Sequence, residues 1–247
     1  MLAKTGDAHV SRCNQLRVGV RAASPAEPAG VSIDSMNLIY VADPMCSWCY
    51  GFGKTMDALL AAPGDAAPLR LALVMGGLRP YTTETLAPGR ADEIVGHWNH
   101  VHEATGLPFA EGSASALRRP DFVYDTEPAS RATVAVRTHW PQHVWRYFKT
   151  VQKAFYAQGR DVTRREVLAA VAEETGLPRD NFEVAFDSEA MHDAARADFA
   201  QAQHWGIRGF PALVAEAGGE LHLVAQGYLP DEALRQRLAA LVRAPAS

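Results

Sequence analysis

The 247-residue chain has little cysteine, no long apolar run and no cluster of basic residues. Its three cysteines are too few for a framework of structural disulfides. Its apolar runs are too short to cross a bilayer, so we expect no membrane partner. A net charge of −4 without a Lys/Arg run argues against nucleic acid as a partner.

What the chain does have is apolar content, since 48% of its residues are hydrophobic. At this length the content is enough for one large domain, or for a domain that carries a substantial insertion. We find no internal repeat, and the only segment of biased composition is the N-terminal leader.

Residues 1–35 differ from the rest of the chain, because they lack apolar periodicity and are rich in Ala and Pro. We interpret them as a disordered leader or a mis-assigned start, with Met36 as the alternative first residue. Arg17 and Arg21 interrupt the best apolar stretch, so we predict no secretory signal and expect a cytoplasmic protein. Cys13 lies in this leader without an obvious partner, and we assign it no role.

The apolar pattern after the leader predicts a strand, a helix and a second strand. The strands span Asn37–Ala42 and Leu69–Met75, and the helix spans about Cys46–Ala61. The second strand is apolar except for Arg70, which is typical of a buried parallel strand. This order is a βαβ unit.

A block of helices follows over residues 86–200. The expected helices cover Ala91–Thr105, Pro128–Trp140, Val144–Gln158, a stretch after Thr163, Asn181–Phe186 and Ser188–Trp205. Thr163 and Glu166 match a capping box at the start of one of them. A segment this long is not a loop, so we expect a packed helical insertion.

Strands return near the C-terminus. Ala212–Glu216 and Leu221–Ala225 flank Gly218-Gly219, which predicts a hairpin, and Asp231–Arg243 has the apolar stripe of a helix. The predicted fold class is therefore α/β. Residues 36–85 and 201–247 form a thioredoxin-sized unit of order β-α-β then β-β-α, with the all-helical insertion of residues 86–200 between its halves.

Cys46-Ser47-Trp48-Cys49 is the most informative motif in the chain. Two thiols one helical turn apart share a face, so their sulfurs can meet in a disulfide. Cys46 would lie at the helix N-terminus, where unpaired amides and the helix dipole stabilise a thiolate. The thiolate is the reactive form in disulfide exchange. The motif therefore predicts a dithiol/disulfide redox site.

Three segments together resemble the DsbA-like thioredoxin superfamily, and within it the FrnE-type branch. They are residues 43–52 (DPMCSWCYGF), Gly76-Gly77-Leu78 and residues 206–211 (GIRGFP). The resemblance runs from about Met36 to Val242. It implies a thioredoxin fold with a helical insertion, disulfide oxidoreductase activity and a cis-proline at Pro211.

The resemblance also assigns roles to the motif. Cys46 would be the exposed nucleophile that forms a mixed disulfide, and Cys49 would resolve it. Ser47 and Trp48 would tune thiolate stability and access. Many relatives have proline at the first of these two positions, and the periplasmic oxidants have histidine at the second. Without that positive charge the chain is predicted to be less oxidising than those proteins.

The segment Gly209-Phe210-Pro211 matches the family positions that lie against the active site and contact the bound substrate. An extended substrate could pair with this backbone by strand addition. Asp43 has two interpretations, as a proton acceptor for Cys49 or as a strand-end carboxylate that contacts amides. Its negative charge would also oppose ionisation of Cys46.

Two other groups of residues permit alternative sites. His97, His100 and His102 could supply zinc ligands together with the cysteine pair, although a polar helix face is the favoured interpretation. Arg131 could bind a carboxylate such as that of glutathione, although an ion-paired or solvated arginine is favoured. Tyr147, Phe148, Phe155 and Tyr156 recur at helical spacing and are predicted core.

We therefore predict a protein-disulfide oxidoreductase that acts on protein or small-molecule disulfides and dithiols. It would need no metal and no bound cofactor, with glutathione as a possible co-substrate and a homodimer as a possible assembly. One alternative is a glutathione-dependent isomerase or transferase of the kappa or hydroxychromene carboxylate isomerase type, although those relatives usually keep one serine in place of the pair. Another is a non-catalytic thioredoxin-like adaptor.

Overall fold

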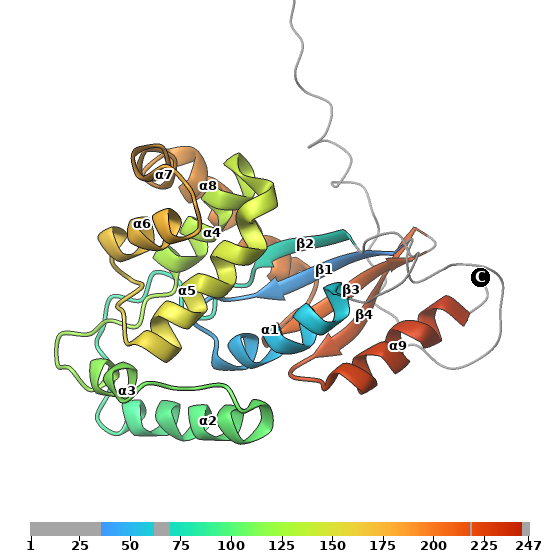
Figure 1. Ribbon diagram of the computed structural model, residues 1–247, viewed down its shortest axis with the longest axis horizontal. Coiled ribbons are helices and arrows are strands. Elements are labelled where there is room, and N and C mark those ends of the chain that lie inside the picture. The colour runs from blue at the N-terminus through green and yellow to red at the C-terminus, as the bar shows by residue number, and fades with distance from the viewer. Residues whose placement is uncertain (1–35, 62–69, 218, 244–247) are drawn as a thin grey trace, which may run out of the picture.

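A computed structural model describes residues 36–61, 70–217 and 219–243 of the chain. Its centre is a four-stranded sheet in the order β2-β1-β3-β4 (Figure 1). The strands are β1 (Asn37–Ala42), β2 (Arg70–Met75), β3 (Ala212–Ala217) and β4 (Glu220–Gln226). β1 and β2 are parallel, and the other two pairs are antiparallel. The predicted order of strands is confirmed.

The helices of the described residues divide into those that belong to the sheet and those of the insertion. Helix α1 (Ser47–Leu60) and helix α9 (Asp231–Arg243) flank the sheet (Figure 1). The insertion contains α2 (Arg90–Thr105), α3 (Glu111–Leu117), α4 (Glu127–His139), a short 3-10 helix (Pro141–His143), α5 (Val144–Gln158), α6 (Arg165–Glu174), α7 (Arg179–Phe186) and α8 (Glu189–His204). The exact domain boundaries remain a prediction.

The strands alternate side chains between two apolar layers, as pleated strands must. Leu38, Tyr40 and Leu213 lie on one face and pack with α1, α9 and α5. Val41 and Val214 lie on the other face, in a smaller cluster with the end of α8. A third cluster fills the insertion and contains Tyr147, Phe155 and Tyr156, while Phe148 joins the first. The prediction that these four aromatics are core is confirmed.

A partly buried ion pair joins the insertion to the edge strand β2. Arg137 of α4 donates to both carboxylate oxygens of Asp198 on α8, at 2.6 and 2.9 Å. The same guanidinium donates to the Leu73 carbonyl, and the Asp198 carboxylate accepts the Met75 N–H at 2.8 Å. Two side chains from the insertion thus satisfy a carbonyl and an amide that an edge strand otherwise leaves free.

The structure differs from the sequence-based expectations in three details. Thr163 is not the N-cap of α6, because its hydroxyl donates to Asp161 instead and Arg164 occupies the cap position. Helix α3 and the 3-10 helix were not predicted, since both are too short for an apolar period to show.

Leu69, Gly218 and the leader, including Cys13, lie outside the described residues. No helix in the described ranges is long and apolar enough to span a bilayer.

Replacing Asp198 by Ala is expected to lower the free energy of unfolding by about 2–4 kcal/mol, because it leaves the Arg137 charge and the Met75 amide without their acceptor. Urea unfolding measures this change. The matched control is Asp193→Ala on the same helix, whose ion pair with Arg196 is exposed; it should cost less than about 0.5 kcal/mol. Equal losses in the two variants would contradict the role given to Asp198.

Candidate active site

The cysteine pair lies where β1 passes into α1. Cys46 is the N-cap residue of α1, with an extended backbone, and Cys49 follows one turn later. The helix has no acidic residue in its first turn, so no side chain of that turn neutralises the positive end of its dipole. Neither described cysteine is in a disulfide. The local geometry is the one that the motif predicted.

Cys46 is less exposed than the resemblance implied, with only 7% of its surface accessible. The segment before β3 covers it, and the Cys46 thiol lies 3.7 Å from the Phe210 carbonyl oxygen. The Phe210–Pro211 peptide bond is cis. A residue 164 positions away in sequence therefore forms one side of the nucleophile's surroundings. A sulfur that is to react with Cys46 would therefore have to pass half-buried residues such as Trp48 and Phe210.

Gly76 is the position on which the Phe210 ring rests. A Cβ atom placed on Gly76 would lie only 2.0 Å from the nearest atom of that ring. The missing side chain therefore allows the loop after β2 to pack directly against the residue that covers Cys46. This explains why a glycine follows β2, which is a partly exposed edge strand and not the buried strand that its apolar sequence suggested.

Asp43 is fully buried and links two segments of the site. Its Oδ1 accepts the Met45 N–H at 2.8 Å, and its Oδ2 accepts the Leu78 N–H at 2.7 Å. The structure thus shows the second of the two interpretations, a carboxylate that contacts amides. Burial raises the pKa of Asp43 to about 6, while hydrogen bonds from Leu78 and Met45 work in the opposite direction.

Cys49 is completely buried, one turn deeper than Cys46. Burial raises the pKa of the Cys49 thiol above its ordinary value, and the neighbouring Cys46 and the charge of Asp43 raise it further. The buried thiol is therefore harder to ionise than a solvated one. This environment suits a resolving cysteine that must give up its proton only once a mixed disulfide has formed.

Several aromatic residues that the sequence did not single out complete the site. The Tyr40 hydroxyl donates to the Cys49 carbonyl at 3.3 Å, and the Tyr124 hydroxyl donates to the Met45 carbonyl at 2.6 Å. The Trp48 ring packs against Tyr228, with 5.6 Å between the ring centroids. A tyrosine distant in sequence gives no local signal of such a role. Ser47 is half-buried between the cysteines.

The structure supports neither the zinc site nor the anion-binding site that the sequence permitted. No group of three or more His, Cys, Asp or Glu side chains in the described ranges is placed to hold a metal, so the zinc interpretation has no ligand set. His97 and His100 are exposed on α2, with 6.4 Å between their ring centroids. Arg131 is buried against Glu127, its Nε 2.7 Å from the carboxylate, and donates to the Phe186 carbonyl. The anion-binding interpretation of Arg131 is therefore wrong.

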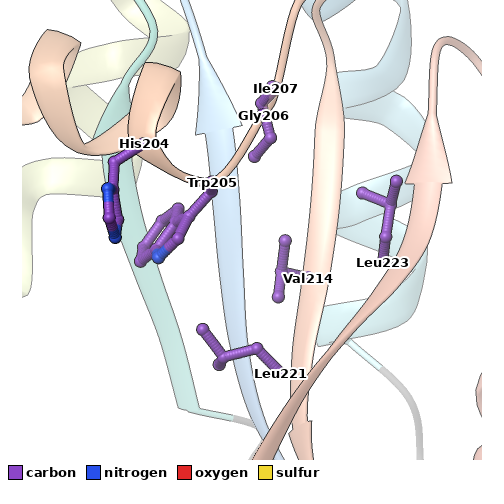
Figure 2. A pocket seen from close by; sticks show the side chains of 7 residues that line it. All are labelled: His204, Trp205, Gly206, Ile207, Val214, Leu221 and Leu223. Carbon is purple, nitrogen blue, oxygen red and sulfur yellow. The ribbon is translucent and has the colours of Figure 1, made fainter. Parts of the chain in front are cut away.

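A separate cavity of about 410 Å³ opens on the other face of the sheet (Figure 2). Its lining comes from the end of α8 and from β3 and β4: His204, Trp205, Gly206, Ile207, Val214, Leu221 and Leu223. None of the predicted site residues lines it. The chemistry of the cysteine pair therefore has to take place at the surface around Cys46 rather than in this cavity.

Comparison with known protein families identifies the family to which this chain belongs. The model of the DSBA-like thioredoxin domain matches residues 37–239. The chain belongs to this family. The DsbA-like assignment and the thioredoxin fold with a helical insertion are thereby confirmed, while membership of the FrnE-type branch stays a prediction.

Two solved structures of DsbA-like proteins are similar over most of both chains. One is a candidate protein disulfide isomerase from Nitrosomonas europaea, 39% identical, with a TM-score of 0.75 over 83% of this chain and 96% of that one. The other is the cytosolic disulfide reductase DsbM from Pseudomonas aeruginosa, 26% identical, with a TM-score of 0.67 over 81% and 96%. DsbM has also been solved with glutathione.

A more distant curated relative is the ClpXP adapter protein SpxH of Halalkalibacterium halodurans, 21% identical over 178 residues. The match covers 70% of this chain but only 56% of that protein. The chain thus spans little more than half the length of this curated relative.

Replacing Gly76 by Ala is expected to displace the Phe210 ring and to cost about 1–3 kcal/mol of stability through overpacking. Alkylation of Cys46 by iodoacetamide should become faster, because the cover over its thiol is disturbed. Gly53→Ala in α1 is the control: its nearest neighbouring atom would lie 3.8 Å from the new Cβ, so it should stabilise by about 0.5–1 kcal/mol. Unchanged alkylation in Gly76→Ala would refute this account of the cover.

The buried Asp43 carboxyl predicts a pH-dependent stability. Because the native state raises its pKa from 3.8 to about 6, the native state holds the proton more tightly than the unfolded chain does. The free energy of unfolding should therefore fall as pH rises from about 4 to about 6, by about 3 kcal/mol in total from this group. Asp43→Asn removes this contribution, so urea unfolding of both proteins across that range should give curves that are not parallel. Parallel curves would contradict it.

Proposed function

We propose that this protein is a thiol–disulfide oxidoreductase that works through Cys46 and Cys49. The observation that carries the proposal is the position of the Cys46 thiol, at the N-terminus of α1 and 3.7 Å from the carbonyl that precedes Pro211. A thiol at a helix N-terminus is favoured as thiolate, and the neighbouring backbone offers an extended substrate a surface to pair with.

The proposed reaction proceeds in two exchanges. The Cys46 thiolate attacks one sulfur of a substrate disulfide, which forms a mixed disulfide and releases the other substrate sulfur as a thiolate. The Cys49 thiolate then attacks the Cys46 sulfur and releases the second substrate thiolate. The substrate gains two electrons, and the cysteine pair becomes oxidised. The reverse sequence oxidises a substrate dithiol.

Asp43 is the proposed acceptor of the Cys49 proton. It is a fully buried carboxyl near Cys49, and its charge contributes to the raised pKa of that thiol. With its own pKa at about 6, it is ionised at neutral pH and able to take up a proton.

Ser47 and Trp48 are proposed to tune access to Cys46. Gly209, Phe210 and Pro211 are proposed to contact the substrate.

The proposed substrates are protein or small-molecule disulfides and dithiols, with glutathione as a co-substrate. The similarity to DsbM, which is described as cytosolic and was solved with glutathione, supports both this choice and a cytoplasmic location. No bound cofactor enters the reaction, because the two sulfurs carry the electrons. A homodimer remains a proposal.

Redox titration tests the function. In glutathione buffers the wild-type protein should show one reversible two-electron transition, with a potential between about −270 and −120 mV. Trp48 fluorescence is the reporter, because its ring packs on Tyr228 next to the pair. Cys46→Ser should abolish exchange, while Cys49→Ser should accumulate a mixed disulfide that mass spectrometry detects. A protein without any reversible transition would refute the proposal.

An adaptor is the second candidate function, favoured by the similarity to SpxH. It predicts that partner delivery survives in Cys46→Ser. A glutathione-dependent isomerase or transferase would instead bind glutathione without disulfide cycling, and the intact cysteine pair counts against it.

A further inference from the structure

Two loops flank Cys46, and each carries an arginine that forms no ion pair with an acidic side chain of the described residues. The loop of residues 76–81 follows β2, and the loop of residues 206–211 precedes β3. The Leu78 amide and the Met45 amide bind the two oxygens of the same carboxylate, that of Asp43. The 76–81 loop therefore lies directly beside the residue that precedes the nucleophile.

This 76–81 loop is held in place by further polar contacts. The Arg79 N–H donates to the Thr126 hydroxyl at 3.1 Å, and the Thr126 N–H donates to the Arg79 carbonyl at 3.2 Å. The Tyr81 N–H donates to Asp125 at 2.8 Å, and Tyr81 has a φ of 62°, which is rare for a residue other than glycine. The backbone of Arg79 is thus fixed before any substrate binds.

The Arg79 side chain packs on an aromatic residue of the active site. Its guanidinium carbon lies 5.6 Å from the centroid of the Tyr124 ring, in a cation–π contact. The hydroxyl of that same tyrosine donates to the Met45 carbonyl, one residue before Cys46. The Tyr124 side chain therefore contacts both the Arg79 guanidinium and the backbone just before Cys46.

No carboxylate in the described part of the chain forms an ion pair with this guanidinium. Arg131, which is buried, and Arg137, which is half-buried, each have an acidic partner. Arg79 is half-buried and has only the ring. Arg208, exposed in the opposite loop, likewise has no such partner among the described residues. The two loops beside Cys46 thus both present positive charge on a protein whose net charge is negative.

We propose that Arg79 binds a carboxylate of a small acidic disulfide of the glutathione type and so determines substrate preference. This inference rests on the proposed function. A planar guanidinium offers donors in a fork that matches a carboxylate, and the ring beneath it limits its motion. Arg208 supplies a second positive charge for a substrate that carries more than one carboxylate. Leu78 precedes Arg79 in the same loop and is 39% exposed. It would contact the apolar part of the bound disulfide.

The test compares an acidic and a neutral disulfide. Reduced wild-type protein and Arg79→Gln are mixed with glutathione disulfide or with bis(2-hydroxyethyl) disulfide, and the second-order rate constant of oxidation is followed by tryptophan fluorescence. The variant should lose about tenfold with glutathione disulfide, as expected for a charge-assisted hydrogen bond, and little with the neutral compound. Added salt should slow the glutathione reaction of the wild type more than that of the variant.

Arg70→Gln is the matched control. Arg70 is exposed at the far end of β2 from the cysteines and has no carboxylate partner among the described residues. Its loss should leave both rate constants unchanged. Arg79→Lys keeps the charge but not the fork, so it should recover part of the preference for glutathione disulfide.

Three outcomes would overturn the inference. Equal losses with both disulfides would mean that Arg79 acts on the thiols or on the fold, and no loss would mean that it does not meet the substrate. A loss confined to a disulfide-linked peptide with a glutamate beside its cysteine would assign Arg79 to protein substrates instead.

If the wild type reacts with neither disulfide and shows no reversible transition in the redox titration, the proposed function fails. The binding site is then tested separately, by calorimetric titration of S-methylglutathione into wild type and Arg79→Gln. Equal affinities would overturn the inference, and weaker binding by the variant would support it.

Discussion

One buried carboxylate organises the site. Asp43 stands at the end of β1 and accepts one amide from the segment that leads to Cys46 and another from the loop after β2. These segments are more than thirty residues apart in sequence. The carboxyl is kept out of water by that arrangement, which is why burial raises its pKa to about 6. The position of the nucleophile and the shape of the adjacent loop thus depend on one side chain.

The two thiols lie in different electrostatic surroundings although they are one turn apart. Cys46 lies at the positive end of α1, where no acidic side chain of the first turn offsets the dipole. Cys49 is enclosed, and burial together with its neighbours raises its pKa. The difference follows from the fold, because the N-cap position faces the segment before β3 and the next turn points into the core. This difference supports the proposed order of events, in which Cys46 attacks first and Cys49 resolves the mixed disulfide second.

Much of this could be predicted from the sequence, because the informative signals are local. The period of apolar residues located β1, α1 and most insertion helices, and the spacing of Cys46 and Cys49 specified a shared helix face. The contacts that complete the site could not be predicted in this way. Tertiary structure alone brings the Phe210 carbonyl to Cys46, the Tyr124 hydroxyl to Met45 and the Phe210 ring to Gly76. The partial cover of Cys46 follows from those long-range contacts, and so the expected exposure was wrong.

The clamp on β2 has a consequence for how molecules of this protein meet one another. β2 is an outer strand of the sheet, and such strands are templates for adding a further chain. Here the Leu73 carbonyl and the Met75 amide already have partners in Arg137 and Asp198. A neighbouring chain cannot bond to those two groups unless the ion pair first opens. At a high cellular concentration, the same contact that joins two parts of one molecule therefore protects separate molecules from joining edge to edge.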